Sequence, residues 1–241
     1  MQLFILIKMG AMPFSLLAFG FLFGVKHAFD ADHITAISTT LSNNKSIKKS
    51  SLLGMFWGLG HTISLLAVSL AILLLKISIP EKIALSLEFI VGFMLCILGI
   101  NVLITINKNK MHLHKHKHGK QEHIHIHSHK LTKRHDHKHK LFHQSLFIGL
   151  IHGLAGSAVL TLLVLTTIKS VWLGLIYILI FGIGSIIGMI LISSVISLPF
   201  TLIPNNLQRT QKFLRISAGL ISMIIGLTIM YNIGIVEGLL I

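Results

Sequence analysis

The stretch "VKHAFDADHITAI", from Val25 to Ile37, places two histidines and two aspartates between His27 and His33. Apolar sequence surrounds it: "LLAFGFLFG" comes before it, and only the small polar run "STTLSNN" separates it from the next charges. An ionisable side chain in the middle of a membrane costs about 2.5–3.5 kcal/mol on insertion scales, so such residues are usually functional. The stretch therefore indicates where the chemistry of the chain lies.

The composition is that of a membrane protein. Hydrophobic residues make up 53% of the 241 residues, and the mean hydropathy is +0.83. Only 12% of the residues are charged, whereas soluble domains carry about 25%. The first apolar segment is long and contains the charged cluster, which is typical of a broken helix. We expect an all-α polytopic fold, because six apolar segments reach the roughly 20 residues that cross a bilayer: about 12–40, 51–75, 83–106, 144–168, 171–198 and 212–235.

The basic residues predict the orientation of the chain. Ten of the 21 Lys and Arg residues fall between Lys108 and Lys140, in one loop. Together with the loops at 41–50 and 199–215, that side carries 16 of the 21. Because cytoplasmic loops carry the excess of Lys and Arg, we expect the long loop on the cytoplasmic side of the cell membrane and both termini outside the cell. The net charge of +14 then indicates nearby anionic lipid rather than nucleic acid.

The two halves of the chain resemble each other weakly at three places. "FGVKHAFDADHI" from Phe23 aligns with "FIGLIHGLAGSA" from Phe147 if one residue is inserted, and this pairs His27 with His152. "FWGLGHTI" aligns with "IFGIGSII", and "EFIVGFMLCILG" with "RISAGLISMIIG"; the three offsets are 125, 124 and 127 residues. Three spans per half require the second half to run inverted, and such repeats place the substrate near the midplane. We expect repeats at 1–106 and 144–241, joined by a loop at 107–143.

The charged cluster has the donors of a metal site. On a straight helix, His27, Asp30 and His33 share one face, and Asp32 lies about 100° away. If the backbone unwinds near Ala31, Asp32 can join them, which a membrane tolerates where the backbone lines a cavity. Imidazole suits nickel, copper, zinc and iron, and carboxylate keeps the site hard enough to release its ion. No thiolate is nearby in the sequence, which argues against copper(I) or structural zinc.

Further donors lie in other spans. We expect His61 to add an imidazole from the next span, and His152 with Ser157 to complete the site from the second half. Either histidine could instead be a hydrogen-bonded core residue, and Glu88 could simply cap the third span. The predicted metal ligands are His27, Asp30, Asp32, His33, His61 and His152, with Ser157, Glu88 and Thr62 as accessory candidates.

The loop "MHLHKHKHGKQEHIHIHSHKLTKRHDHKHKLFH" holds twelve of the sixteen histidines. Low-complexity histidine tracts bind metals and need no fold. We interpret the loop as a metal-chelating antechamber on the cytoplasmic side. The alternative is a solvated basic tether.

At these residues the sequence resembles the nickel/cobalt transporter family. The family motif reads Arg-His-Ala-Phe/Val-Asp-Ala-Asp-His-Ile, and here "KHAFDADHI" matches it with Lys26 in place of arginine. A second motif, Phe-x-x-Gly-His-Ser/Thr, is similar to "FWGLGHT", which contains His61. The family's acidic third motif is replaced by "GLIHGLAGSAVL". This pattern, with six spans, resembles the smaller branch described as urease-accessory nickel permeases.

The resemblance implies uptake of Ni²⁺, and of Co²⁺ as a second candidate, with the ion as substrate rather than cofactor. It also implies cytoplasmic partners: nickel chaperones or the maturation proteins of urease or hydrogenase. We expect an ATP-independent permease and no enzyme, because the sequence contains no P-loop and no His-Glu-x-x-His motif. Three alternatives stay open: an exporter of the same metals, a membrane metalloenzyme, and a metal store that uses the loop alone.

Overall fold

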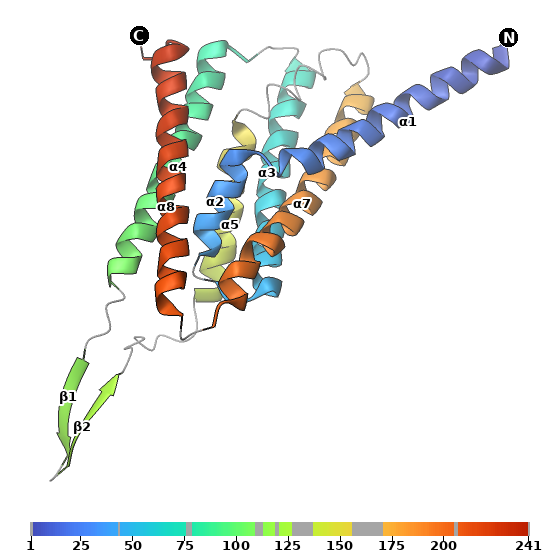
Figure 1. The fold of residues 1–241 in the computed structure, drawn as a ribbon. Helices are drawn as coiled ribbons and strands as arrows, with labels where there is room; N and C mark the ends of the chain where they lie inside the picture. The colour runs from blue at the N-terminus through green and yellow to red at the C-terminus, as the bar shows by residue number, and fades with distance from the viewer. Residues whose placement is uncertain are drawn as a thin grey trace.

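The computed structural model describes residues 2–42, 44–75, 79–108, 113–118, 121–126, 137–155, 171–204 and 207–240. Within these ranges nearly all of the chain is helical (Figure 1). The helices are α1 (Gln2–His27), α2 (Ala31–Leu41), α3 (Ile47–Leu75), α4 (Glu81–Lys108), α5 (His137–Leu154), α7 (Val171–Leu202) and α8 (Gln208–Tyr231), which continues into a short π-helix, η1 (Asn232–Val236).

The expected all-α membrane fold is confirmed. Segments of α3, α4, α7 and α8 are long and apolar enough to cross a bilayer. Phe14–His27 and Ala31–Leu41 meet the same criterion only together, across a bend of 50°, and count as a fifth candidate span if they cross the bilayer as one. The expected break in the first span is therefore present. The span expected at about 144–168 begins with the apolar helix Leu141–Leu154, and its remainder, residues 156–170, lies outside the described part of the chain.

Proline marks two of the helix boundaries. The Pro80 carbonyl accepts hydrogen bonds from the N–H groups of Ile83 and Ala84, at 2.9 and 3.2 Å, as α4 begins. Proline suits the start of a helix because its ring presets φ and its missing N–H would be unpaired there. Between α7 and α8, the Pro204 carbonyl accepts a hydrogen bond from the N–H of Leu207 at 3.1 Å. These turns reverse the chain between neighbouring spans.

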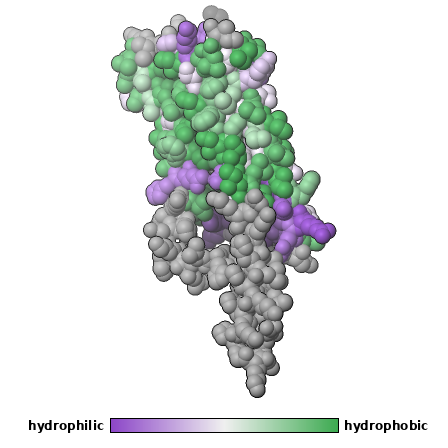
Figure 2. Space-filling model, turned by 90° about the vertical axis from the view of Figure 1, so that its left-hand side faces the viewer, coloured by the Kyte–Doolittle hydropathy of each residue, from purple (hydrophilic) through white to green (hydrophobic). Residues whose placement is uncertain are grey.

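Helices α3 and α7 form the middle of the bundle. Helix α3 packs against α5 and α7, α1 packs against α7, and α4 packs against α8, while α2 lies against α7, α8 and α4. Phe93, Ile183 and Leu191 are about half exposed on the outside. Figure 2 shows an apolar body with hydrophilic residues near its two ends on the face in view. Lipid contact explains this band, because a protein rarely exposes so large an apolar surface to water.

Glycines bring the helices into close contact, as is common between membrane helices. A Cβ on Gly24 in α1 would collide with the carbonyl oxygen of Phe181 in α7. A Cβ on Gly149 in α5 would collide in the same way with the carbonyl oxygen of Trp57 in α3. The two contacts are equivalent in the sequence alignment, which pairs Gly24 with Gly149 and Phe181 with Trp57. Thus α1 sits on α7 as α5 sits on α3.

The helices α4 and α8 make a second set of reciprocal contacts. A Cβ on Gly92 would lie 2.9 Å from the Gly226 carbonyl oxygen, and one on Gly99 would lie 2.5 Å from that of Gly219. The Ser222 hydroxyl donates to the Leu95 carbonyl at 2.8 Å. The sequence alignment, with its offset of 127 residues, pairs Gly92 with Gly219, Gly99 with Gly226 and Leu95 with Ser222. When each residue is replaced by its aligned counterpart, the Gly92–Gly226 contact becomes the Gly219–Gly99 contact, and the Leu95–Ser222 contact stays the same. The interface therefore maps onto itself when the two halves are exchanged.

The histidine-rich segment contains two short strands, β1 (Leu113–His118) and β2 (Gln121–Ile126). They pair antiparallel, with Leu113 opposite Ile126 and His116 opposite His123. Composition alone predicts no fold here, but the alternating pattern of this segment has the period of a strand. Figure 1 places this hairpin at one end of the molecule and both chain termini towards the other.

We predict that Gly149→Val lowers the thermal unfolding midpoint of the purified protein. The added side chain meets backbone atoms of Trp57, which cannot rotate away, and overpacking of this kind costs about 1–3 kcal/mol. Gly24→Val should behave alike, because its Cβ meets the Phe181 backbone. Phe147→Leu, on the exposed side of α5, is the matched control and should leave the midpoint unchanged. An unchanged midpoint for Gly149→Val would contradict the close helix contact.

Candidate metal centre

The break between α1 and α2 organises the site. The Phe29 and Asp30 N–H groups donate to the carbonyls of Lys26 and His27, at 2.9 and 3.1 Å, in a tight turn. Helix α2 then restarts with Asp30 at its N-cap position, in extended conformation with φ −65° and ψ 148°. An N-cap aspartate usually accepts a backbone N–H of its own helix, but Asp30 makes no such bond. Its carboxylate instead accepts a hydrogen bond from His27 Nδ1 at 2.7 Å.

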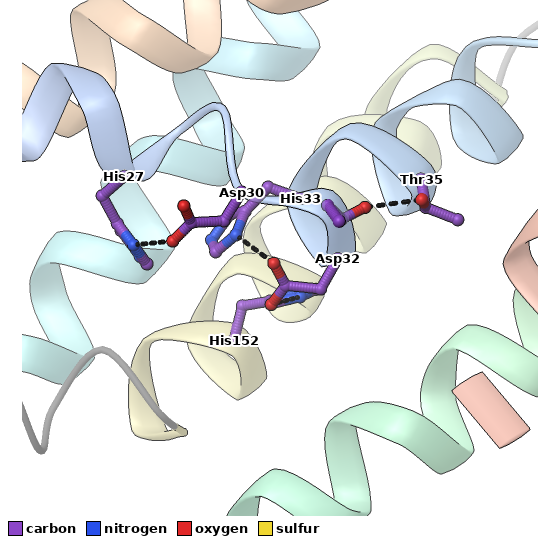
Figure 3. A network of polar contacts seen from close by, with 7 residues as sticks. His27, Asp30, Asp32, His33, Thr35 and His152 are labelled. Atoms are coloured by element: carbon purple, nitrogen blue, oxygen red, sulfur yellow. Dashed lines mark hydrogen bonds and ion pairs between the residues drawn. The ribbon is translucent and has the colours of Figure 1, made fainter. Parts of the chain in front are cut away.

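The same break brings Asp32 inward. Its Oδ1 lies 3.0 Å from His33 Nδ1, within hydrogen-bond geometry. Its Oδ2 lies 3.3 Å from His152 Nε2 on α5, an ion-pair distance (Figure 3). On a straight helix Asp32 would have pointed away from this face, so the broken form of the span is the one that completes the cluster. Asp30 is the more exposed carboxylate, at 51% against 28% for Asp32.

Four imidazole rings meet at this break. The His33 ring centre lies 4.6 Å from that of His27 and 4.5 Å from that of His152. His61, from α3, lies 5.1 Å from His27 and 5.4 Å from His33. The sequence predicted these four histidines as candidate ligands, and the structure brings them together from α1, α2, α3 and α5.

The rings are buried, and most of their nitrogens lack partners. His33, His61 and His152 are at most 2% exposed, and the His27 side chain is 10% exposed. Among the described residues, Nε2 of His27, Nε2 of His33 and both nitrogens of His61 have no hydrogen-bond partner, and neither nitrogen of His152 has one of good geometry. An unpaired buried polar group costs about 1–3 kcal/mol. Nitrogens left in this state are what a bound metal ion would use.

The donors form two groups of three rather than one. One group is His27, His33 and His61; the other is Asp32, His33 and His152. In each group, one donor atom from every residue lies within 4.8 Å of the others. Imidazole nitrogens hold zinc at about 2.0–2.1 Å in a tetrahedral site, which places the donor atoms about 3.3 Å apart. Small side-chain rotations would therefore close either group around a divalent transition-metal ion.

Comparison with known proteins agrees with this chemistry. The family model of the high-affinity nickel-transport proteins, NicO, matches residues 13–239. This chain belongs to the NicO family. It is 41% identical over 241 residues to the urease accessory protein UreH of Bacillus sp. (strain TB-90), which covers 93% of this chain and 94% of the relative. No solved structure matches the chain. It is thus a multi-pass nickel-transport protein and not an enzyme.

The histidine cluster of this NicO protein is also in contact with two aromatic side chains, which the sequence analysis did not single out. The Phe181 ring of α7 lies 5.7 Å from that of His27, and the Trp57 ring of α3 lies 5.5 Å from that of His152. Both are at most 1% exposed. Each directly precedes a glycine in the aligned stretches "FWGLGHTI" and "IFGIGSII", which was the available signal. Ser185 of α7, aligned with His61, has a buried hydroxyl with no partner among the described residues.

The remaining predicted site residues are not among the donors of the two groups in the part of the chain that the structure describes. The Thr62 hydroxyl donates to the Gly58 carbonyl at 2.8 Å and to that of Gly182 at 3.3 Å, so it serves helix packing. Glu88, on α4, is in neither of the two donor groups that the described residues form. Ser157 lies outside the described residues. Asp30 is in neither group and contacts the site through His27 Nδ1.

We predict that His61→Leu keeps or raises the unfolding midpoint of this NicO protein in the presence of a chelator. The substitution removes a buried imidazole whose nitrogens are unpaired, and about 1–3 kcal/mol of desolvation cost disappears with it. The rise in midpoint that nickel causes by binding the native state should shrink. Gln144→Leu, at an exposed position on α5, should change neither value. A lower midpoint in chelator would mean that His61 stabilises the apoprotein.

Proposed function

We propose that this protein is an ATP-independent permease that takes up Ni²⁺, and Co²⁺ as a second substrate, across the cytoplasmic membrane. The observation that carries the proposal is the set of buried imidazoles with unpaired nitrogens beside a carboxylate, inside an apolar bundle. Intramembrane groups of this kind are retained for ion pathways. Imidazole with carboxylate suits nickel and cobalt, and the carboxylate keeps the binding reversible.

The ligands come from both sides of the bundle interior. His27, Asp32 and His33 form the centre of the proposed site, and His61 and His152 supply further imidazoles. Asp30 orients His27 by accepting its Nδ1–H, which leaves Nε2 free for the metal. A carboxylate behind a ligating histidine fixes its tautomer and raises its basicity. We place Ser157 at the same centre, as the residue aligned with Asp32.

The permease is built from two inverted three-span repeats, residues 1–106 and 144–241, around the loop 107–143. The reciprocal glycine contacts support this: Gly24 meets Phe181 as Gly149 meets Trp57, and the α4–α8 interface maps onto itself. Residues 156–170 would complete the sixth span. An ion site between the halves is then at the midplane, where inverted repeats place their substrates.

The basic loop faces the cytoplasm and both termini face outward in this proposal, by the excess of Lys and Arg on the loop side. A divalent ion moving inward gains about 4.6 kcal/mol per 100 mV of inside-negative potential. The membrane potential alone can therefore drive accumulation. The relative named a urease accessory protein supports delivery of the ion to cytoplasmic nickel chaperones or urease or hydrogenase maturation proteins.

We predict that expression raises radiolabelled nickel in intact cells, and that His27→Ala or Asp32→Ala reduces this accumulation by at least about tenfold, since loss even of a ligand's supporting partner costs 10- to 100-fold. Gln144→Ala, on the exposed side of α5, is the control and should accumulate nickel normally. Membrane levels of each variant are measured by immunoblot. Lower cell nickel on expression would instead identify an exporter.

We predict that deletion of residues 112–140 leaves nickel uptake measurable. The donor groups lie in α1, α2, α3 and α5, so a permease retains its path without the loop. The deletion should lower only the amount of nickel that the purified protein retains at high metal concentration, because histidine tracts bind metal weakly. Loss of all uptake with normal membrane levels would make the loop part of the transport path.

A further inference from the structure

The two donor groups share one residue. His33 belongs both to the group with His27 and His61 and to the group with Asp32 and His152. Its Nδ1 faces Asp32 at 3.0 Å, and its Nε2 is buried without a partner among the described residues. Because Nδ1 faces Asp32, it points toward the second group, and Nε2 is the ring nitrogen left for the first. A single ion held by all of these donors at once would need them in one group, which the structure does not form.

The two groups are related through a single pair of aligned residues, because His61 is aligned with Ser185 and Asp32 with Ser157. His27 and His152 are paired by the sequence alignment, and each ring lies against an aromatic residue of the opposite half. His27 is 5.7 Å from Phe181, and His152 is 5.5 Å from Trp57; these aromatic residues are themselves paired by the alignment. His33 stands between the two histidines, at 4.6 and 4.5 Å. It has no histidine counterpart, because the residue aligned with it is Ala158.

We propose that His33 passes a single ion between two half-sites, the His27–His61 half-site and the Asp32–His152 half-site. This rests on the proposed nickel transport. The ion is bound by Nε2 of His33 in the first half-site and by Nδ1 in the second, and it changes half-site as the two halves of the bundle exchange conformation. Two divalent cations on one neutral imidazole would repel each other strongly at this separation, so the half-sites alternate and are not filled together.

The two half-sites differ in the donors that an ion would meet. The first offers three imidazoles and no carboxylate, whereas the second offers two imidazoles and the Asp32 carboxylate. Asp32 contacts both His33 and His152, so the second half-site carries a formal negative charge. An ion therefore gains or loses a carboxylate each time it moves, which makes the two bound states distinguishable by spectroscopy.

The test is a double-mutant cycle with His61→Ala and His152→Ala. Equilibrium binding of radiolabelled nickel by the full-length protein is measured in chelator-buffered nickel, which keeps the weak loop histidines unloaded, and uptake is measured in vesicles. When one half-site is removed, the ion can still bind at the other. Removing the weaker half-site therefore reduces affinity by at most about twofold, while the double variant loses at least about 100-fold. Coupling of this size is the signature of shared function. Each single variant should still lose uptake by at least about tenfold.

X-ray absorption of the bound nickel provides the second measurement. The His152→Ala variant should hold nickel by imidazoles without the Asp32 carboxylate, and the His61→Ala variant should keep a carboxylate ligand. His152→Gln, which preserves size and polarity, guards against misfolding, and Gln144→Ala, at an exposed position on α5 outside the histidine-rich loop, is the matched control. If both single variants lose about 10- to 100-fold in affinity and the losses multiply in the double variant, all donors form one site and the handover is wrong.

Other outcomes also decide the matter. Wild-type uptake by His152→Ala would show that the second half-site is not on the path. Two nickel ions per chain at the buffered concentration would show independent sites. Absence of nickel binding by the wild type would overturn the proposed function itself, whereas wild-type binding and uptake with one indivisible site would overturn the handover alone.

Discussion

The proposed metal site depends on imidazole nitrogens that stay unpaired inside an apolar helix bundle. An apolar helix bundle in lipid can satisfy its backbone only by its own hydrogen bonds, and here the buried rings do not use that backbone. The surrounding glycine contacts hold α1 on α7 and α5 on α3 at backbone distance. Packing holds His61 and His152, and one hydrogen bond to an aspartate orients each of His27 and His33, so the remaining ring nitrogens stay available.

The interruption of the first span is what reconciles this demand with the sequence. A continuous helix could align only part of the charged cluster, and one carboxylate would face away. The turn at residues 28–30 gives up a few helical hydrogen bonds and separates the roles of the two aspartates. Asp30 orients His27, and Asp32 joins His33 to His152. The first span is thus broken where the candidate ligands lie, and the described part of the last span contains a second irregularity, the π-helix Asn232–Val236.

Much of this could be read from the sequence. The long apolar runs predicted the crossings, and the charged cluster predicted both a break and the histidines that gather there. The different roles of Asp30 and Asp32 could not be predicted, because they depend on the direction of the chain after the turn. Trp57 and Phe181 were overlooked because an aromatic residue in an apolar span is usually a packing residue, and their place before an aligned glycine is a weak signal. The hairpin at 113–126 was missed since the alternating histidines were read as composition and not as a strand period.

The unusual use of Asp30 has a consequence for how tightly the ion is held. Helix α2 begins at the break, so its partial positive charge of about half a unit, carried by its first N–H groups, is directed at the cluster. An aspartate in the N-cap position would ordinarily quench that charge by accepting those N–H groups, but this one is turned to His27 instead. A cation at the proposed site would therefore meet the free N–H groups of α2 on one side and the carboxylate of Asp32, in the first turn of the same helix, on the other. For a protein that must release its ion as readily as it binds it, the repulsion between the cation and these N–H groups would favour rapid release.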